Sequence, residues 1–294
     1  MRMHHMRLGM MTETFKRYMT QEESLKCIKD FGFDVADITL FETGDYSKPD
    51  PDIFIGDYIQ RARQIKRYAE EIGLPIVQSH APFPVHKEDD DAYNAYILDI
   101  LIKCIEVCGI IGVKNLVIHP WNNWNYLENA AFFRNLLPYA KKHNVIICTE
   151  NMWNWDHQNH HAIPAACSSP EDFLKHIEAV NDDYLQACVD VGHANMMSMV
   201  SDVTTPSNMV RVLNQHVKCF HIHDNDGVHD SHETPFTMKL DWDALAKAIK
   251  DIHYEGDLII EISGKPDYNL EQTLQRNSLQ EAAGRRLIKL IGEQ

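Results

Sequence analysis

Eight short apolar segments, each followed by a segment with helical character, constrain the fold of this chain more than any other feature. The apolar segments are rich in Val, Ile, Leu and Cys and lie at 7–10, 33–40, 76–79, 115–118, 145–149, 185–189, 217–222 and 258–260. Such continuous apolar runs are typical of parallel strands that are buried on both faces. Capping residues and glycines delimit predicted helices at 24–31, 54–72, 91–108, 127–143, 170–180, 206–215, 241–253 and 278–291.

Eight strands that alternate with eight helices predict a single (β/α)₈ TIM barrel. A doubly wound open sheet is the alternative, but it would more often carry a glycine-rich phosphate loop after its first strand, and this chain has none. Because no linker, low-complexity tract or block of charge interrupts the pattern, we expect one domain over residues 1–294.

Imidazoles and carboxylates follow the predicted strands, at the point where each apolar run ends. These residues are His80, His119, Glu150, Asp190, His193, His223, Asp230, His232 and Glu261. In a barrel the carboxyl ends of the strands meet at one mouth, so we expect the side chains to surround one cavity. Any one of them could be an ordinary buried or loop residue. Together they predict a divalent metal site, because neutral His with Asp or Glu suits zinc or manganese.

The densest part of this pattern is the stretch 217–233, which passes from a buried strand into a run of imidazoles and carboxylates. Strand alternation places His221 and His223 on the same face, and Asp230 and His232 have the same spacing. A solvated polar loop is the alternative interpretation of this stretch.

Charge and cysteine content limit the class of protein. The formal net charge of −15 argues against a nucleic-acid partner, because affinity for a phosphate backbone needs a basic face. No apolar run approaches the ~20 residues of a membrane helix. Residues 1–6 lack the apolar core of a secretory signal. The seven cysteines are odd in number and form no CxxC pair, which favours reduced thiols in a cytoplasmic protein. Assembly into a homo-oligomer stays open.

Aromatic residues are concentrated in the segments that follow the predicted strands. Flat rings fit the apolar face of a sugar, so we expect them to line a carbohydrate site rather than only to pack the loops. The residues assigned to substrate binding are Phe83, Trp121, Trp153, Trp155, His193 and His221.

Taken in order, the strand-end motifs resemble those of the xylose-isomerase-like barrel superfamily over essentially the whole chain. This superfamily contains sugar and sugar-phosphate isomerases and epimerases, and also metal-dependent apurinic endonucleases. The motifs are Ser79-His80-Ala81-Pro82, Ile118-His119-Pro120, Glu150-Asn151, Asp190-Val191-Gly192-His193, His221-Ile222-His223-Asp224-Asn225-Asp226-Gly227, Asp230-Ser231-His232 and Ile260-Glu261.

The resemblance implies a core metal ion held by Glu150, Asp190, His223 and Glu261. His223 is preferred to His221 because His223-Asp224-Asn225-Asp226 better matches the His-x-x-acid motif with which this strand ends in the family. In the endonuclease branch the resemblance implies further metals, which gives one to three ions in all. Their ligands would be His80, His119, His193, Asp230 and His232.

Glu150 and Glu261 end the fifth and eighth predicted strands, so they approach a bound sugar from different sides and can remove and deliver a proton. We therefore expect a metal-dependent isomerase or epimerase of a small sugar or sugar phosphate that acts through an enediolate. Lys265 is the candidate phosphate contact. One alternative is a metal-dependent phosphodiesterase that resembles the apurinic endonucleases, although the sequence after Asn151 departs from their glycine-bearing pattern. A second is a metal-binding barrel without turnover.

Overall fold

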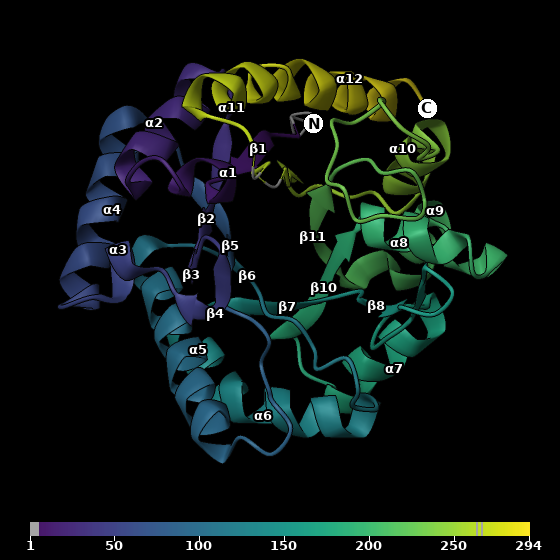
Figure 1. Ribbon diagram of the computed structural model, residues 1–294, viewed down its shortest axis with the longest axis horizontal. Helices are drawn as coiled ribbons and strands as arrows, with labels where there is room; N and C mark the ends of the chain where they lie inside the picture. The colour runs from purple at the N-terminus through teal and green to yellow at the C-terminus, as the bar shows by residue number, and fades with distance from the viewer. Residues whose placement is uncertain (1–5, 263, 266) are drawn as a thin grey trace.

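Eight parallel strands close into a barrel in the computed structural model, which describes residues 6–262, 264–265 and 267–294 (Figure 1). The order around the barrel is β1-β12-β11-β10-β7-β6-β5-β2, and the pairing of Leu8 with Leu258 closes it. The predicted TIM barrel is confirmed, and each predicted apolar segment overlaps one of its strands. The strands are β1 (Leu8–Met11), β2 (Val35–Thr39), β5 (Ile76–His80), β6 (Asn115–Val117), β7 (Ile146–Glu150), β10 (Leu185–Asp190), β11 (Val217–Ile222) and β12 (Leu258–Ile260).

The larger helices form an outer ring around the barrel (Figure 1). They are α2 (Gln21–Asp30), α4 (Tyr58–Ile72), α5 (Asp91–Ile111), α6 (Tyr126–His143), α7 (Pro170–Val180), α9 (Pro206–Leu213), α10 (Trp242–Asp251) and α12 (Gln280–Glu293). Sequence signals set several ends, such as the Thr20 capping box before α2 and the left-handed Gly73 after α4. The predicted helix 54–72 begins too early, because Gly56 has a φ of +85° and Asp57 caps α4.

Several short elements at the mouth of the barrel were not predicted. Two hairpins pair β3 (Phe41–Glu42) with β4 (Asp45–Pro49), and β8 (Trp153–Asp156) with β9 (His161–Pro164). Short helices are α1 (Glu13–Lys16), α3 (Pro51–Phe54), α8 (Val191–Ser198) and α11 (Leu270–Asn277), with a 3₁₀ turn at Asp202–Thr204. A second 3₁₀ turn, Asn214–His216, lies at the other end of the barrel, between α9 and β11. The strands of the two hairpins are short and mix polar with apolar residues, so no clear hydrophobic periodicity marks them in the sequence.

The core lies mainly between the barrel and its helices, while a smaller cluster of Val117, Cys148, Cys188 and Cys219 fills the barrel interior. All seven cysteines are free thiols, as expected. Among the described residues no helix has the length and apolarity needed to cross a bilayer. Residues 1–5, which the expectation about a secretory signal concerns, lie outside the described residues.

Candidate metal centre

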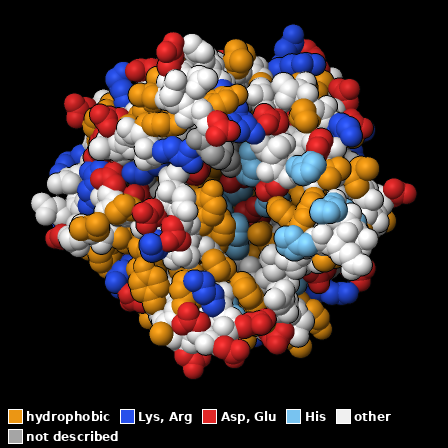
Figure 2. All heavy atoms as spheres, in the orientation of Figure 1, with side chains coloured by type: hydrophobic (Ala, Val, Ile, Leu, Met, Phe, Trp, Pro, Cys, Tyr) orange, Lys and Arg blue, Asp and Glu red, His pale blue; other side chains and the backbone are white. Residues whose placement is uncertain are grey.

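A cavity of about 520 Å³ opens at the mouth of the barrel, where the carboxyl ends of the strands meet. Figure 2 shows this hollow, with acidic and histidine side chains at its base and apolar side chains around it. Seven of the predicted metal-binding residues line the cavity: His80, His119, Glu150, His193, Asp230, His232 and Glu261. Asp190 and His223 are completely buried beneath them.

The four side chains that we call the core set, Glu150, Asp190, His221 and Glu261, converge at the floor of this cavity. Nδ1 of His221 lies 3.3 Å from Glu150 Oε2, 3.2 Å from Glu261 Oε2 and 3.9 Å from Asp190 Oδ2. Ligand atoms that sit about 2.1 Å from a metal ion are roughly 3 to 3.5 Å from one another. The two glutamate distances fall in this range and the distance to Asp190 lies somewhat beyond it, so His221, Glu150 and Glu261 have the spacing of ligands around one cation.

Buried atoms of the core set lack hydrogen-bond partners even though they lie close together. Glu150 Oε2 and both ring nitrogens of His221 form no hydrogen bond with any residue that the structure describes, although the 3.3 Å between Glu150 Oε2 and His221 Nδ1 is short enough for an ion pair. These two atoms are close enough for a hydrogen bond but are not aligned for one. Such an arrangement is expected when two metal-binding atoms point at the same ion. Because unpartnered buried polar atoms are costly, a cation that accepts these lone pairs would satisfy them.

A second group, the His80 set, consists of His80, His119 and Glu150. The Nε2 atoms of the two histidines are 3.1 Å apart, and they lie 3.8 Å and 3.3 Å from Glu150 Oε2. His80 Nδ1 donates to the carbonyl of Ala81 at 2.8 Å, which leaves Nε2 with its lone pair facing the cavity. This set shares Glu150 with the core set.

A third group, the His232 set, consists of His193, Asp230 and His232. Asp230 Oδ2 lies 3.3 Å from His193 Nε2 and 3.2 Å from His232 Nε2. The opposite nitrogens contact backbone carbonyls, with Nδ1 of His193 2.9 Å from the oxygen of Asn151. Each of the three sets thus combines imidazole with carboxylate, and in the His80 and His232 sets one ligand atom from each residue lies within 4.8 Å of the others.

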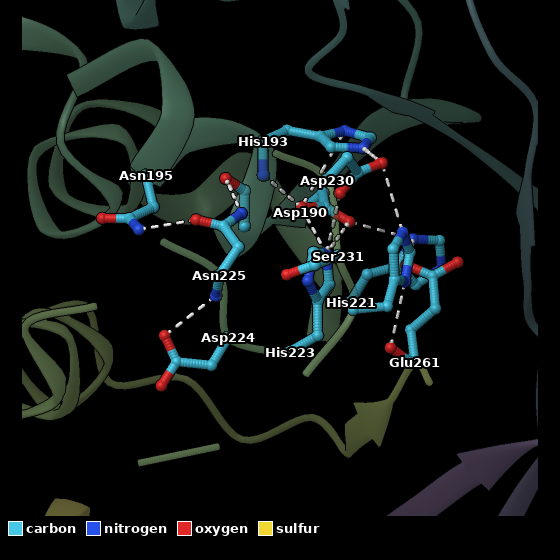
Figure 3. Close-up of polar contacts among 12 residues, drawn as sticks. Asp190, His193, Asn195, His221, His223, Asp224, Asn225, Asp230, Ser231 and Glu261 are labelled. Atoms are coloured by element: carbon cyan, nitrogen blue, oxygen red, sulfur yellow. Dashed lines mark hydrogen bonds and ion pairs between the residues drawn. The ribbon is translucent and has the colours of Figure 1, made fainter. Parts of the chain in front are cut away.

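His221, in β11, and His223, directly after it, have different surroundings. His221 lies within the core set, whereas Nε2 of His223 is 3.1 Å from both carboxylate oxygens of Asp190 (Figure 3). The sequence assigned His223 to the core metal, and that assignment remains a prediction. The contacts with Glu150 and Glu261 belong to His221.

Electrostatics separates the two glutamates. Burial opposes ionisation of Glu150, but His221 and His119 outweigh it and hold its pKa well below the usual range. Burial raises the pKa of Glu261 to about 8, against the opposing effect of His221. When no cation is bound, these shifts favour the ionised form of Glu150 and the protonated form of Glu261.

Aromatic residues form the walls of the cavity, as the sequence suggested. Phe83, Trp121, Trp153 and His193 all line it. Trp155 lies outside the lining, with its ring centroid 6.2 Å from that of Trp153, and His221 is buried below the cavity.

Sequence reasoning missed several lining residues, among them Glu13, Phe41 and Tyr46. Phe41 and Tyr46 belong to the unpredicted hairpin β3–β4, and Tyr46 stacks on Phe83 with ring centroids 5.0 Å apart. Glu13 belongs to the four-residue helix α1 and is only 6% exposed. Its carboxylate accepts one hydrogen bond, from the Gly264 amide at 3.3 Å. Glu13 lies outside the three sets.

No Lys or Arg lines the cavity within the part of the chain that the structure describes. Lys265, the predicted phosphate contact, donates to the Ser231 carbonyl at 2.9 Å and to Glu233 Oε1 at 2.6 Å. Its ammonium group is thus engaged by the protein.

The long connection from β11 to α10 carries Asp230 and His232, and one buried carboxylate ties it together. Asp224 accepts hydrogen bonds from the amides of Asn225, Met238 and Leu240, and from the indole of Trp242. Hydrogen bonds to a charged acceptor contribute about 1.5–3 kcal/mol each. This carboxylate fixes both ends of the connection.

Curated relatives match only part of the chain. An uncharacterized protein, y4fM, of Sinorhizobium fredii is 26% identical over 178 residues, which cover 56% of this chain and 52% of that protein. A protein of Mycoplasmopsis agalactiae named "Probable endonuclease 4" is 24% identical over 234 residues, 70% of this chain and 77% of its own length. The chain thus spans about half of y4fM.

Solved structures match the whole fold. A D-tagatose 3-epimerase-like protein is 18% identical with a TM-score of 0.73, and the match covers 98% of this chain and 99% of that one. D-psicose 3-epimerase, solved in the presence of D-fructose, is 12% identical with a TM-score of 0.70 over 96% and 99%. The IolI protein, solved with a zinc atom, is 16% identical with a TM-score of 0.73 over 97% and 98%. At these identities the matches demonstrate the fold alone.

The family comparison covers more of the sequence than any of the curated relatives above. The model described as the xylose isomerase-like TIM barrel matches residues 25–283, a range that contains every residue of the three sets. This chain therefore belongs to the xylose isomerase-like TIM barrel family.

Proposed function

We propose that this protein is a metal-dependent isomerase or epimerase of a small sugar. The observation that carries the proposal is the placement of Glu150 and Glu261 in one cavity, at 3.3 Å and 3.2 Å from Nδ1 of His221. Two carboxylates that face the same bound sugar can remove a proton from it and return one to it from two sides.

The proposed divalent ion, zinc or manganese, would be held by Glu150, Asp190, His221 and Glu261. His221 replaces His223 in this proposal because His221 makes the contacts with both glutamates. When bound, the ion supplies a Lewis acid that stabilises negative charge on the oxygens of an enediolate. The His80 and His232 sets could hold one further ion each, so the total remains one to three.

The protein's own groups would bind the sugar and move the proton. The rings of Phe83, Trp121 and Trp153 would cover the apolar face of the sugar and exclude water. One glutamate would remove the proton from a carbon atom beside the carbonyl group, and the same or the other glutamate would return a proton. Return to the same carbon on the opposite face gives epimerisation, and return to the neighbouring carbon gives isomerisation.

The cavity supports an uncharged sugar over a sugar phosphate. Its described lining carries carboxylates and imidazoles but no Lys or Arg, and Lys265 is already bound to Glu233. D-tagatose and D-psicose 3-epimerases, to which the fold is similar, have unphosphorylated sugars in their names.

Incubation of the zinc- or manganese-loaded protein with a panel of aldoses and ketoses in D₂O tests the proposal. Proton NMR should reveal a new sugar isomer and deuterium at the carbon atom that exchanges its proton. Elemental analysis of protein purified without added metal should find bound zinc or manganese. Metal binding without exchange or product for any sugar would instead favour the barrel without turnover.

Glu13 is expected to bind the substrate rather than to catalyse. Glu13→Gln should raise KM for the sugar by about 10-fold and leave kcat nearly unchanged, since it removes a charge-assisted hydrogen bond away from the reacting carbons. Steady-state kinetics measures both constants. Glu88→Gln is the control, because Glu88 is a carboxylate outside the cavity lining. A fall in kcat at constant KM would contradict this role.

Phosphodiester cleavage is the second candidate, because the His80 and His232 sets supply possible ligands for further metal ions and a protein named as an endonuclease is among the relatives. The net charge of −15 and the cavity lining oppose it. We expect no binding to an intact or abasic-site DNA duplex at low salt, where phosphate contacts are strongest. Fluorescence anisotropy and gel assays of the metal-loaded protein measure binding and cleavage. Cleavage at the abasic site would replace the sugar proposal.

A further inference from the structure

His223 has no access to solvent and lies outside the cavity lining, yet it contacts two of the metal sets. Its Nε2 is 3.1 Å from each carboxylate oxygen of Asp190, a member of the core set (Figure 3). In the tautomer that carries its proton on Nε2, His223 donates a hydrogen bond to this carboxylate. His223 therefore fixes the direction of the Asp190 carboxylate.

The same imidazole stacks on His232, a member of the His232 set. The ring centroids of His223 and His232 are 4.0 Å apart, and the planes differ by only 5°. One face of the His232 ring is thereby covered, so the ring cannot turn without displacing His223. A single buried side chain thus contacts one carboxylate of the core set and one imidazole of the His232 set.

A glycine makes the space for this ring. A Cβ atom at Gly192 would lie 1.9 Å from Cε1 of His223, far closer than two carbon atoms approach without bonding. Gly192 is the second residue of α8 and lies two positions after Asp190, the residue that ends β10 and carries the proposed metal-binding carboxylate. The ring position of His223 therefore depends on the absence of a side chain at residue 192.

We propose that His223 is a positioning residue that couples the core set to the His232 set, and is not itself a metal ligand. The proposal rests on the metal centre proposed above. Partners that hydrogen-bond to metal ligands orient them, and their loss typically weakens metal binding by about 10–100-fold. Direct coordination is the competing assignment, because donor atoms of His223, His232 and Glu261 also lie within 4.8 Å of one another.

Two substitutions separate the contacts of His223. His223→Phe keeps a flat ring for the stack on His232 but removes the donor to Asp190. His223→Gln keeps a donor and removes the ring. Gly192→Ala, which obstructs the space for the ring, should disturb both contacts. His229→Gln is the matched control, since His229 lies in the same connection, is exposed and pairs only with Asp226 and the ring of Trp155 among the contacts described.

Metal content and affinity are the measurements, with Zn²⁺ titrated against a competing chelator. Each His223 variant should bind as many ions per chain as the wild type at saturation, with affinity lowered roughly 10-fold or more. His223→Phe should weaken the core ion most, and His223→Gln the ion of the His232 set. The visible spectrum of the Co²⁺ form should keep its band positions, because the ligands are the same.

Loss of one ion per chain at saturation in His223→Phe would identify His223 as a ligand and overturn the proposal. Unchanged affinity in both His223 variants would overturn it as well. A wild-type protein that binds no metal would instead refute the metal centre itself. Thermal unfolding of the metal-free proteins tells a folding defect apart from a binding defect, and the two His223 variants remain informative if Gly192→Ala does not fold.

Discussion

Glu150→Gln and Glu261→Gln should each reduce turnover of the sugar by about 100- to 10,000-fold, the range that a general acid or base contributes. Glutamine keeps the size of the side chain but cannot accept a proton at neutral pH. The two carboxyl groups line one cavity, and both lie near Nδ1 of His221. We expect each to reach a different side of the bound sugar, so neither can replace the other in proton transfer. Initial rates and deuterium exchange from D₂O measure the loss.

Both glutamates also belong to the core set, so a lost ion could mimic a lost proton-transfer group. Metal content must therefore be determined for each variant at the zinc or manganese concentration of the assay. Glu71→Gln, at the exposed end of α4, is the control for a carboxylate-to-amide change. If a variant with normal metal content kept near-normal turnover, its glutamate would be excluded as the proton-transfer group.

His221→Asn should weaken binding of the core ion by more than about 100-fold, beyond the effect expected for a residue that only orients a ligand. His221 supplies the imidazole nitrogen that lies within 3.9 Å of all three carboxylates of the core set. Its loss removes one ligand and leaves the acidic side chains of Glu150, Asp190 and Glu261 without the imidazole that lies near all three. Chelator competition with Zn²⁺ measures the affinity, and elemental analysis measures the number of ions.

His160→Asn is a suitable control, because His160 is an exposed residue at the tip of the β8–β9 connection. His160 also has a φ of +54°, a backbone conformation that asparagine tolerates well. A His221→Asn protein that bound the core ion as tightly as the wild type would return the assignment to His223.

The barrel could be predicted because a parallel strand that is buried on both faces leaves a continuous apolar run in the sequence. The polar residue that ends such a run is recognisable by contrast, which is why Glu150 and Glu261 were found. They follow the apolar runs of β7 and β12, and the closure of the barrel brings them into one cavity.

The choice between His221 and His223 could not be made from the sequence. Alternation places both on one face, but β11 ends at Ile222, and His223 turns to Asp190 beyond the strand end. Its place depends on Gly192, a residue on a different element. Glu13 was missed for a related reason, since a four-residue helix has no periodicity that would distinguish a cavity-lining carboxylate from a solvated one.

The hydrogen bonds to the carboxylate of Asp224 also determine how the β11–α10 connection unfolds locally by thermal motion. It accepts hydrogen bonds from Asn225 at the start of the β11–α10 connection, and from Met238, Leu240 and Trp242 at its end. Local unfolding involves cooperative units, and this connection would open as one when those bonds break. Asp230 and His232 would then leave together, while Glu150, Asp190 and His221 stay on barrel strands. The ion of the His232 set would therefore be released first on mild heating, long before the barrel itself melts.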